Sequence, residues 1–276
     1  MKSQVIACFI SLAAVVLSHG GIFFYIIDGI RYAGNTWLLD AYAGGVYPTP
    51  DPPPPSIQRR WYYAPIFDPM SKNMTCSYDG ASTPTALHAT IKAGSNISTD
   101  YQNPNRADSW PNDWNHSEGP MLAYMAACPG ESCEGFDGSG KVWFKIDQTG
   151  LAPSAVDLRG PWIQLYTISS SLQGPGYTVT IPKNLKPGNY LIRHEIIMVR
   201  SKPPQFYPDC AQLTVTGDGT KFPGDEYLVS FPGAYSLEDP GLAMTNDWFA
   251  PGRNPVLPEW ETLDYPFPGP PLWTGD

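Results

Sequence analysis

Four histidines are the residues of this chain whose types and positions could support catalysis or metal binding: His19, His88, His116 and His194. His19 is the most informative of them if it begins the exported chain. Its α-amino group and one ring nitrogen could then bind the same metal ion. A second imidazole would complete a set of three nitrogen ligands, which suits Cu(II). The free amino group has a pKa of about 7.7 to 8, and a metal can displace its proton.

A signal peptide would create that terminus. Lys2 is followed by the apolar stretch Val5 to Leu17 and then by the small residue Ser18. Such a stretch is too short to span a bilayer comfortably and is typical of a secretory signal. We therefore predict that residues 1–18 are removed, that His19 begins the exported protein, and that the protein is secreted. Because no second apolar run of spanning length follows, we expect no membrane association.

The other histidines leave alternatives open. His116 lies in a loop before Gly119-Pro120, which equally fits a functional ligand and an ordinary surface side chain. His194 shares a strand face with apolar residues, so it is either a core histidine or a proton donor just beneath a site. His88 lies beside Thr90 and Lys92, and we expect it to be exposed and inert.

The cysteines fit an oxidising compartment. Cys8 would leave with the signal peptide, and four cysteines allow three pairings. Cys128 and Cys133 flank a Pro-Gly turn and are expected to pair locally, which leaves Cys76 to pair with Cys210. Zinc-site spacing is absent. The sequons at Asn73 and Asn96 are predicted to carry glycans. The sequon at Asn115 adjoins His116, so we expect it to be unoccupied or shielded.

Ordinary hydrolysis has little support in the sequence. It contains no Gly-x-Ser-x-Gly motif, no dinucleotide or phosphate loop, and no pair of carboxylates whose spacing marks a glycosidase. Lys plus Arg total 17 against 26 for Asp plus Glu, a net charge of −9. This acidic balance argues against binding to nucleic acid or to an anionic membrane.

Composition and patterning predict the elements that must position these residues. The chain of 276 residues has 31 Pro and 26 Gly, which favours short strands joined by rigid loops over a helix bundle. Alternating apolar residues predict strands, and these are residues 21–28, 86–93, 142–146, 177–181, 190–199 and 211–216. On the first strand, Ile22, Phe24 and Ile26 should share a face. Residues 118–127 are the one helix candidate, which Gly119-Pro120 weakens.

These signals together predict an all-β fold, an immunoglobulin-like antiparallel β-sandwich with long loops. Residues 19–276 would form a single domain, with no appended binding module. From Phe222 onward the chain is rich in Pro and aromatic residues. We expect this part to be a long arm packed across the sandwich.

Ordered motifs along residues 19–276 resemble those of the fungal lytic polysaccharide monooxygenases of auxiliary activity family 9, formerly glycoside hydrolase family 61. The motifs are His19-Gly, Pro65-Ile-x-Asp68, His116-x-x-Gly-Pro-Met, Arg193-His-Glu195, Gln205-Phe-Tyr-Pro-Asp-Cys210 and Tyr265-x-Phe-Pro-Gly-Pro. The resemblance implies one copper ion per chain, bound by the amine and ring of His19, by His116 and by axial Tyr207. It also assigns His194 and Gln205, with Tyr207, to the surroundings of the bound oxygen species.

The implied activity is oxidative cleavage of cellulose or a related β-1,4-glucan at C1, at C4 or at both. It would use O₂ or H₂O₂ and an external electron donor. Tyr265 and Tyr25 would stack on the sugar rings, and the family disulfides match Cys76–Cys210 and Cys128–Cys133. We expect a monomer. The alternative is a non-catalytic secreted protein that binds copper or carbohydrate and keeps the two histidines.

Overall fold

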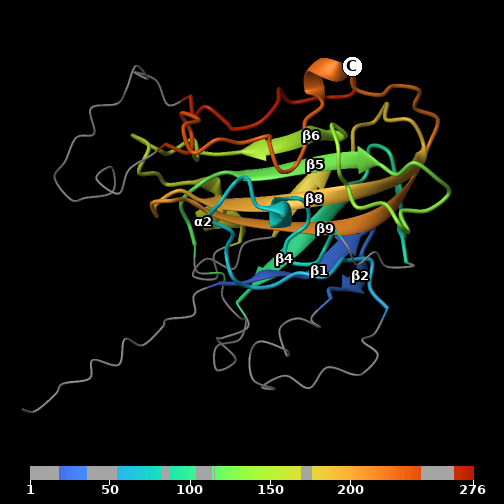
Figure 1. The fold of residues 1–276 in the computed structure, drawn as a ribbon, viewed down its shortest axis with the longest axis horizontal. Coiled ribbons are helices and arrows are strands. Elements are labelled where there is room, and N and C mark those ends of the chain that lie inside the picture. Colours follow the sequence, from blue (N-terminus) through green and yellow to red (C-terminus); the bar gives the residue numbers. More distant parts are fainter. Residues whose placement is uncertain are drawn as a thin grey trace, which may run out of the picture.

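Two β-sheets packed face to face form the centre of the molecule (Figure 1). The computed structural model describes residues 19–35, 55–81, 87–103, 114, 116–168, 176–243 and 264–276. The four-stranded sheet has, in spatial order, β2 (Ile30–Ala33), β1 (Gly21–Ile27), β4 (Asn96–Gln102) and β7 (Tyr177–Thr180). The five-stranded sheet has β3 (Ala89–Lys92), β9 (Gln205–Thr216), β8 (Gly188–Met198), β5 (Met121–Ala127) and β6 (Trp143–Thr149).

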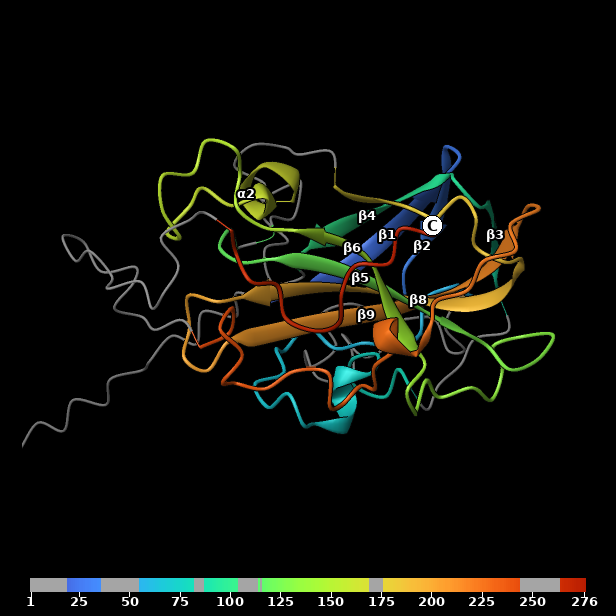
Figure 2. The ribbon, with the colours of Figure 1, turned by 90° about the horizontal axis from the view of Figure 1, so that it is seen from above.

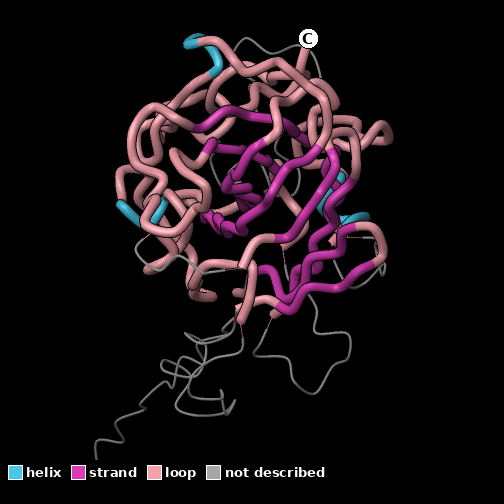
Figure 3. The backbone as a smooth tube through the Cα atoms, turned by 90° about the vertical axis from the view of Figure 1, so that its right-hand side faces the viewer, coloured by secondary structure: helices cyan, strands magenta, loops and turns pink. Residues whose placement is uncertain are grey.

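The helices in the described ranges are short: η1 (Lys72–Met74), α2 (Ile163–Thr167) and η3 (Asp225–Tyr227). Figure 3 shows them at the periphery, with loops around the strands. The predicted β-sandwich is confirmed. Neighbouring strands are antiparallel except β3 and β9, which are parallel. Within these same ranges, no helix has the length and apolar character that crossing a membrane requires.

Strand β1 differs from its predicted pattern. Its pairing with β4 shifts between Ile22 and Phe24, which marks a β-bulge. A bulge places two residues opposite one and reverses the alternation of side chains beyond it. The buried residues are therefore Ile22, Tyr25 and Ile27, while Ile26 is 40% exposed.

The predicted helix at residues 118–127 is wrong, because residues 121–127 form β5. Met, Leu and Ala favour helices, but this segment pairs with β6 on one side and with β8 on the other, inside the larger sheet. Both of its faces are buried, so it shows no polar alternation that would have revealed a strand. Strands β2 and β4 were not predicted from the sequence.

The two described disulfides match the predicted pairs, Cys76–Cys210 and Cys128–Cys133. The first ties residues 55–81 to β9. In the same region, the Arg59 amide donates a hydrogen bond to the Cys210 carbonyl at 2.9 Å. Figure 2 shows this segment, with η1, alongside β9.

His88 is half-buried rather than exposed and inert. Its Nε2 accepts a hydrogen bond from the backbone amide of Cys133 at 3.0 Å. It therefore helps to fix the small disulfide loop, which corrects the expectation for this residue.

The described part of the C-terminal arm lies along β6, as predicted. The Trp273 amide donates to the Lys145 carbonyl at 2.9 Å, and Lys145 Nζ donates to the Pro268 carbonyl at 2.7 Å. Figure 1 shows this segment passing over β6. The arm thereby covers the edge strand of the larger sheet.

Candidate metal centre

His19, His116 and Tyr207 converge at one end of the sandwich. The ring centroids of His19 and His116 are 6.3 Å apart, and those of His19 and Tyr207 are 6.2 Å apart. Nε2 of His116 and the Tyr207 hydroxyl oxygen are 2.9 Å apart. The fold thus brings together the three side chains that the sequence motifs select as metal ligands.

Each of these residues is held by a different part of the larger structure. His19 precedes β1, His116 precedes β5, and Tyr207 is the third residue of β9. Gly20 lets the first strand approach β4 closely, since a Cβ atom there would lie 1.9 Å from the Gln102 carbonyl oxygen. A larger residue at position 20 would therefore displace His19 from its neighbours.

Trp114 forms an aromatic wall of the centre. Its ring packs edge-on against His116 at 5.3 Å and against Tyr207 at 5.1 Å, between ring centroids. The side chain is 2% exposed. No role was predicted for Trp114, and its position two residues before His116 was the one signal of this role in the sequence.

Both histidines are electrostatically suited to bind a metal. Burial, and to a smaller extent the neighbouring His19, lowers the pKa of His116 to about 4. Burial also lowers the pKa of His19. Neutral imidazole is the form that coordinates metals, so protons do not compete at neutral pH.

Tyr207 completes the donor set from the β9 side. Its hydroxyl donates a hydrogen bond to Oε1 of Gln205 at 2.5 Å. Burial raises the pKa of Tyr207, so the phenol stays protonated and is a weak ligand. Two imidazoles, a phenol and the amine of a chain that begins at His19 make a nitrogen-rich set that fits Cu(II). Across the described segments, no cluster of three or more His, Cys, Asp or Glu side chains offers another metal site.

The structure corrects the role predicted for His194. In the β8–β9 register, Tyr207 lies opposite Ile196 and Gln205 lies opposite Met198, whereas His194 lies opposite Asp209. At about 3.4 Å per residue, His194 is about 7 Å deeper in the sandwich than the Tyr207 position. Its ring lies 6.0 Å from that of Tyr25, between centroids.

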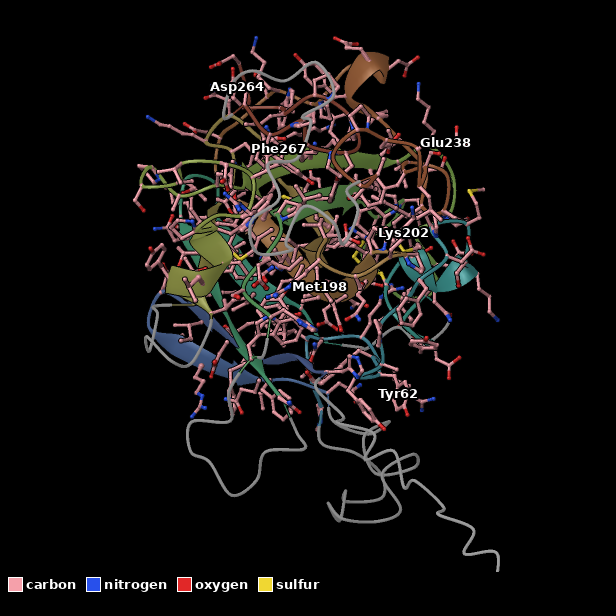
Figure 4. All side chains as sticks on the ribbon, turned by 90° about the vertical axis from the view of Figure 1, so that its left-hand side faces the viewer. Tyr62, Met198, Lys202, Glu238, Asp264 and Phe267 are labelled. Atoms are coloured by element: carbon pink, nitrogen blue, oxygen red, sulfur yellow. A yellow bond between two sulfur atoms is a disulfide. The ribbon has the colours of Figure 1, made fainter. Side chains whose placement is uncertain are left out.

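The surroundings of His194 are those of the core. The side chain is fully buried, and burial lowers its pKa to about 3. Figure 4 labels Met198, which lies at the end of the molecule that faces the viewer. Arg200 is the next residue after Met198 on the strand face that carries His194, and its side chain donates a hydrogen bond to Glu118. No role was predicted for Met198 or Arg200 from the sequence.

The predicted stacking residues are also corrected. Tyr25 is fully buried between the sheets, and Tyr265 is 6% exposed. The Tyr265 hydroxyl donates to the Gly241 carbonyl at 2.7 Å, and its ring packs edge-on with Trp162 and Phe267. Neither ring presents a face that a polymer could cover.

The predicted glycosylation positions differ in accessibility. Asn96 is exposed at the first residue of β4, and Asn73 is half-buried in η1. Asn115 lies outside the described residues. Glycan attachment at Asn73 and Asn96 stays a prediction.

Comparison of the chain with known proteins finds matches to one protein family. A family model described as Auxiliary Activity family 9 (formerly GH61) matches residues 19–250. A family 9 lytic polysaccharide monooxygenase-like protein from Agaricus bisporus is 40% identical over 95% of this chain and 72% of its own length. Lytic polysaccharide monooxygenase B from Heterobasidion irregulare is 37% identical over 95% of both chains.

Solved structures agree with the sequence matches. The crystal structure of a cellulose-active polysaccharide monooxygenase from M. thermophila is similar with a TM-score of 0.73 and 31% identity. The match covers 93% of this chain and 99% of that one. The sandwich and the sequence therefore lead to the same family.

Proposed function

Since this chain belongs to Auxiliary Activity family 9, the family formerly called GH61, we propose that it is a secreted copper-dependent monooxygenase that cleaves cellulose or a related β-1,4-glucan. The observation that carries this proposal is the convergence of His19, His116 and the Tyr207 hydroxyl at one end of the sandwich. Removal of residues 1–18 would add the α-amine of His19 to the donors. One copper per chain, attack at C1, C4 or both, and a monomeric state belong to the same proposal.

Copper bound there would supply one-electron chemistry that lets O₂ or H₂O₂ replace a C–H bond of the sugar by C–OH. With O₂, one oxygen atom enters the sugar and the other leaves as water. That balance requires two electrons from an external donor and two protons. The hydroxylated carbon then loses its glycosidic bond.

The protein's own side chains prepare this site. His19 and His116 are held neutral by burial, and Trp114 packs against His116 so that its ring orientation is fixed. The hydrogen bond from Tyr207 to Gln205 aligns the phenol and leaves the Gln205 amide group to act as a donor. Such preorganisation is what outer-shell hydrogen bonds contribute in metal sites.

A non-catalytic copper- or carbohydrate-binding protein is the second candidate function. One observation favours it: His194, which the family resemblance assigned to the site, lies in the core instead. The named Agaricus bisporus relative is described as monooxygenase-like. Intact His19, His116, Gln205 and Tyr207 favour the enzyme.

The test is mass spectrometry of soluble products. Protein that begins at His19, loaded with copper, is incubated with amorphous cellulose with and without ascorbate. Reductant-dependent aldonic acids would indicate C1 attack, and gem-diol oligosaccharides would indicate C4 attack. The His116→Ala variant should form neither.

Native oligosaccharides formed without reductant would identify a hydrolase and contradict the proposal. Copper binding without oxidised products from cellulose, xyloglucan or xylan would establish the non-catalytic alternative.

A further inference from the structure

Three aromatic side chains of the described residues are exposed on the surface: Phe67, Tyr166 and Phe222. Their exposed fractions are 46%, 43% and 46%. Covering an exposed aromatic ring with a partner removes apolar area from water and is therefore favourable. Because Tyr25 and Tyr265 are buried, these three rings offer the largest exposed aromatic fractions for stacking on a sugar among the residues that the structure describes.

Phe67 lies beside the candidate metal centre. Ile66 and Phe206 exchange two backbone hydrogen bonds, at 3.0 and 2.9 Å, in an antiparallel bridge. In that register the next residues along the two chains, Phe67 and Gln205, lie opposite one another. Side chains alternate between faces, so Phe67 and Gln205 share a side while Ile66 and Phe206 point into the outer core.

The loop that carries Phe67 is rigidly tied to the sheet. A turn follows at once, in which the Ser71 amide donates to the Asp68 carbonyl at 3.0 Å. The Met70 amide donates to Asp68 Oδ1 at 2.8 Å. The Cys76–Cys210 disulfide then joins the segment covalently to β9. A ring held this way loses little conformational entropy when it meets a ligand.

Tyr166 lies on the other side of the same end. It belongs to α2, where the neighbouring Thr167 hydroxyl contacts Met121 Sδ at 3.5 Å. Met121 pairs with Ile196, which pairs with Tyr207. Along the strand direction, α2 therefore lies at the same height as Tyr207 of the candidate metal centre. Figure 4 shows α2 on one side of Met198 and the segment with η1 on the other.

The spacing fits an extended ligand rather than a small one. The strand of Ile66, then β9, β8 and β5 follow one another across the sheet. Three strand spacings correspond to about 14 Å. Phe67 and α2 are thus carried on opposite sides of the β9–β8 pair, and this spacing suits an extended ligand such as a polymer better than a small molecule.

We propose that Phe67 and Tyr166 are stacking platforms for a β-glucan on either side of the candidate metal centre. This inference rests on the proposed function and assigns its substrate surface to residues that the family motifs did not select. Aromatic faces offer apolar area to the C–H faces of sugar rings without requiring charge. A neutral glucan is the partner that such a surface fits.

Phe222 supplies a matched control. It is as exposed as Phe67, yet it lies beside Lys186, Gly188 and Tyr190 at the first residues of β8. The metal centre lies beyond the opposite end of that strand, near Met198. With 11 residues in β8, the two ends are about 33 Å apart.

The experiment measures binding of the copper-loaded protein to amorphous cellulose by depletion from solution. Phe67→Ala and Tyr166→Ala should each weaken binding about 3- to 10-fold. Phe67→Tyr should restore it, and Phe222→Ala should leave it within twofold of the unchanged protein. Phe222→Ala, which is remote from the candidate metal centre, should also leave copper affinity and H₂O₂ formation without substrate unchanged.

Two results would overturn the inference while leaving the proposed function intact. One is that the unchanged protein releases oxidised sugars while Phe67→Ala and Tyr166→Ala bind cellulose normally. The other is an equal loss with Phe222→Ala. Slower reduction by a redox partner with normal cellulose binding would assign the surface to the electron donor instead. An unchanged protein that neither binds nor cleaves any β-glucan would overturn both proposals.

Discussion

The two faces of β8 bury polar groups in opposite ways. On the outer face, Arg193 donates two hydrogen bonds to Glu195 at 2.8 Å each, and Tyr235 donates to Glu195 at 2.7 Å. On the inner face, both ring nitrogens of His194 lack a partner in the described part of the chain. The same is true of the Tyr101 hydroxyl.

The difference separates a hydrogen-bonded structural network from a layer whose buried polar atoms lack a protein partner among the described residues. The outer network also reaches the loop of η1, because Arg193 donates to the Met74 and Thr75 carbonyls. It therefore joins the disulfide segment to the sheet through protein atoms alone. Buried polar groups without protein partners usually bind ordered water, which is what we expect beside His194. We therefore expect the outer face to contribute most to the free energy of unfolding, and the inner face to make that free energy depend on pH.

The largest expected effect is loss of the long-range disulfide that closes the outer layer. Cys76→Ala with Cys210→Ala opens a loop of sequence separation 134, whereas Cys128 and Cys133 are separated by 5. Chain entropy predicts a loss of about 5 kcal/mol for the first pair and about 2 kcal/mol for the second. Urea unfolding measures both. Equal losses would show that the outer layer does not depend on this crosslink.

Breaking the buried ion pair should cost nearly as much. Arg193→Met leaves Glu195 buried without its partner, and we expect a loss of about 3 to 5 kcal/mol in the free energy of unfolding. Arg159→Met, which breaks the exposed pair with Asp157, should cost about 0 to 1 kcal/mol.

Adding Glu195→Gln to Arg193→Met should recover part of the loss, because it removes the uncompensated charge. Similar unfolding free energies for Arg193→Met and Arg159→Met would contradict the role of the outer network.

Removing one hydroxyl from each layer compares the two directly. Tyr235→Phe deletes a donor to the buried Glu195 carboxylate and should cost about 1.5 to 3 kcal/mol. Tyr101→Phe deletes a hydroxyl without a protein partner and should be neutral or slightly stabilising. Thermal and urea unfolding of the two variants provide the comparison. If Tyr101→Phe destabilises as much as Tyr235→Phe, the two faces are not different in kind.

The inner layer should show its effect as pH dependence. His194 faces Asp209 on β9, Tyr25 on β1 and Tyr177 on β7. Its pKa is about 3 in the folded protein, below its ordinary value, so the unfolded chain takes up a proton first as pH falls. His194 therefore lowers stability between about pH 6.5 and pH 3, and it has no effect on pH dependence above that window.

The His194→Gln variant removes this titration. Relative to the variant, the unchanged protein should lose about 1.4 kcal/mol of stability between pH 7.5 and pH 5.5. The measurement is urea unfolding of both proteins at each pH. Parallel curves would show that His194 is not buried in its neutral form.

The contrast between the two faces also shows what sequence could predict. The types of His19, His116 and Tyr207, with the resemblance around them, selected three candidate ligands whose side chains the structure brings together. The role of His194 could not be judged this way, because its depth depends on the pairing of Ile196 with Tyr207 across two strands.

The sequence also did not show which aromatic side chains are buried. An aromatic residue such as Tyr25 suits both a core and a stacking surface, and a bulge in β1 decided that it points inward. The strand at residues 121–127 carried helix-forming residues because both of its faces are buried in the sheet. In both cases, hydrogen-bonded pairing with strands distant in sequence determined the burial or the secondary structure, which the local pattern of residues did not specify.

Copper binding at the chain terminus tests the central claim most directly. Isothermal titration and electron paramagnetic resonance would compare protein beginning at His19 with protein carrying one additional Ala before His19, and with His116→Ala. We predict that the unextended protein binds one Cu(II) with nitrogen hyperfine structure and that both changes weaken binding roughly 100-fold or more. Equal affinity and an unchanged spectrum in all three proteins would contradict the assignment of the centre to His19 and His116.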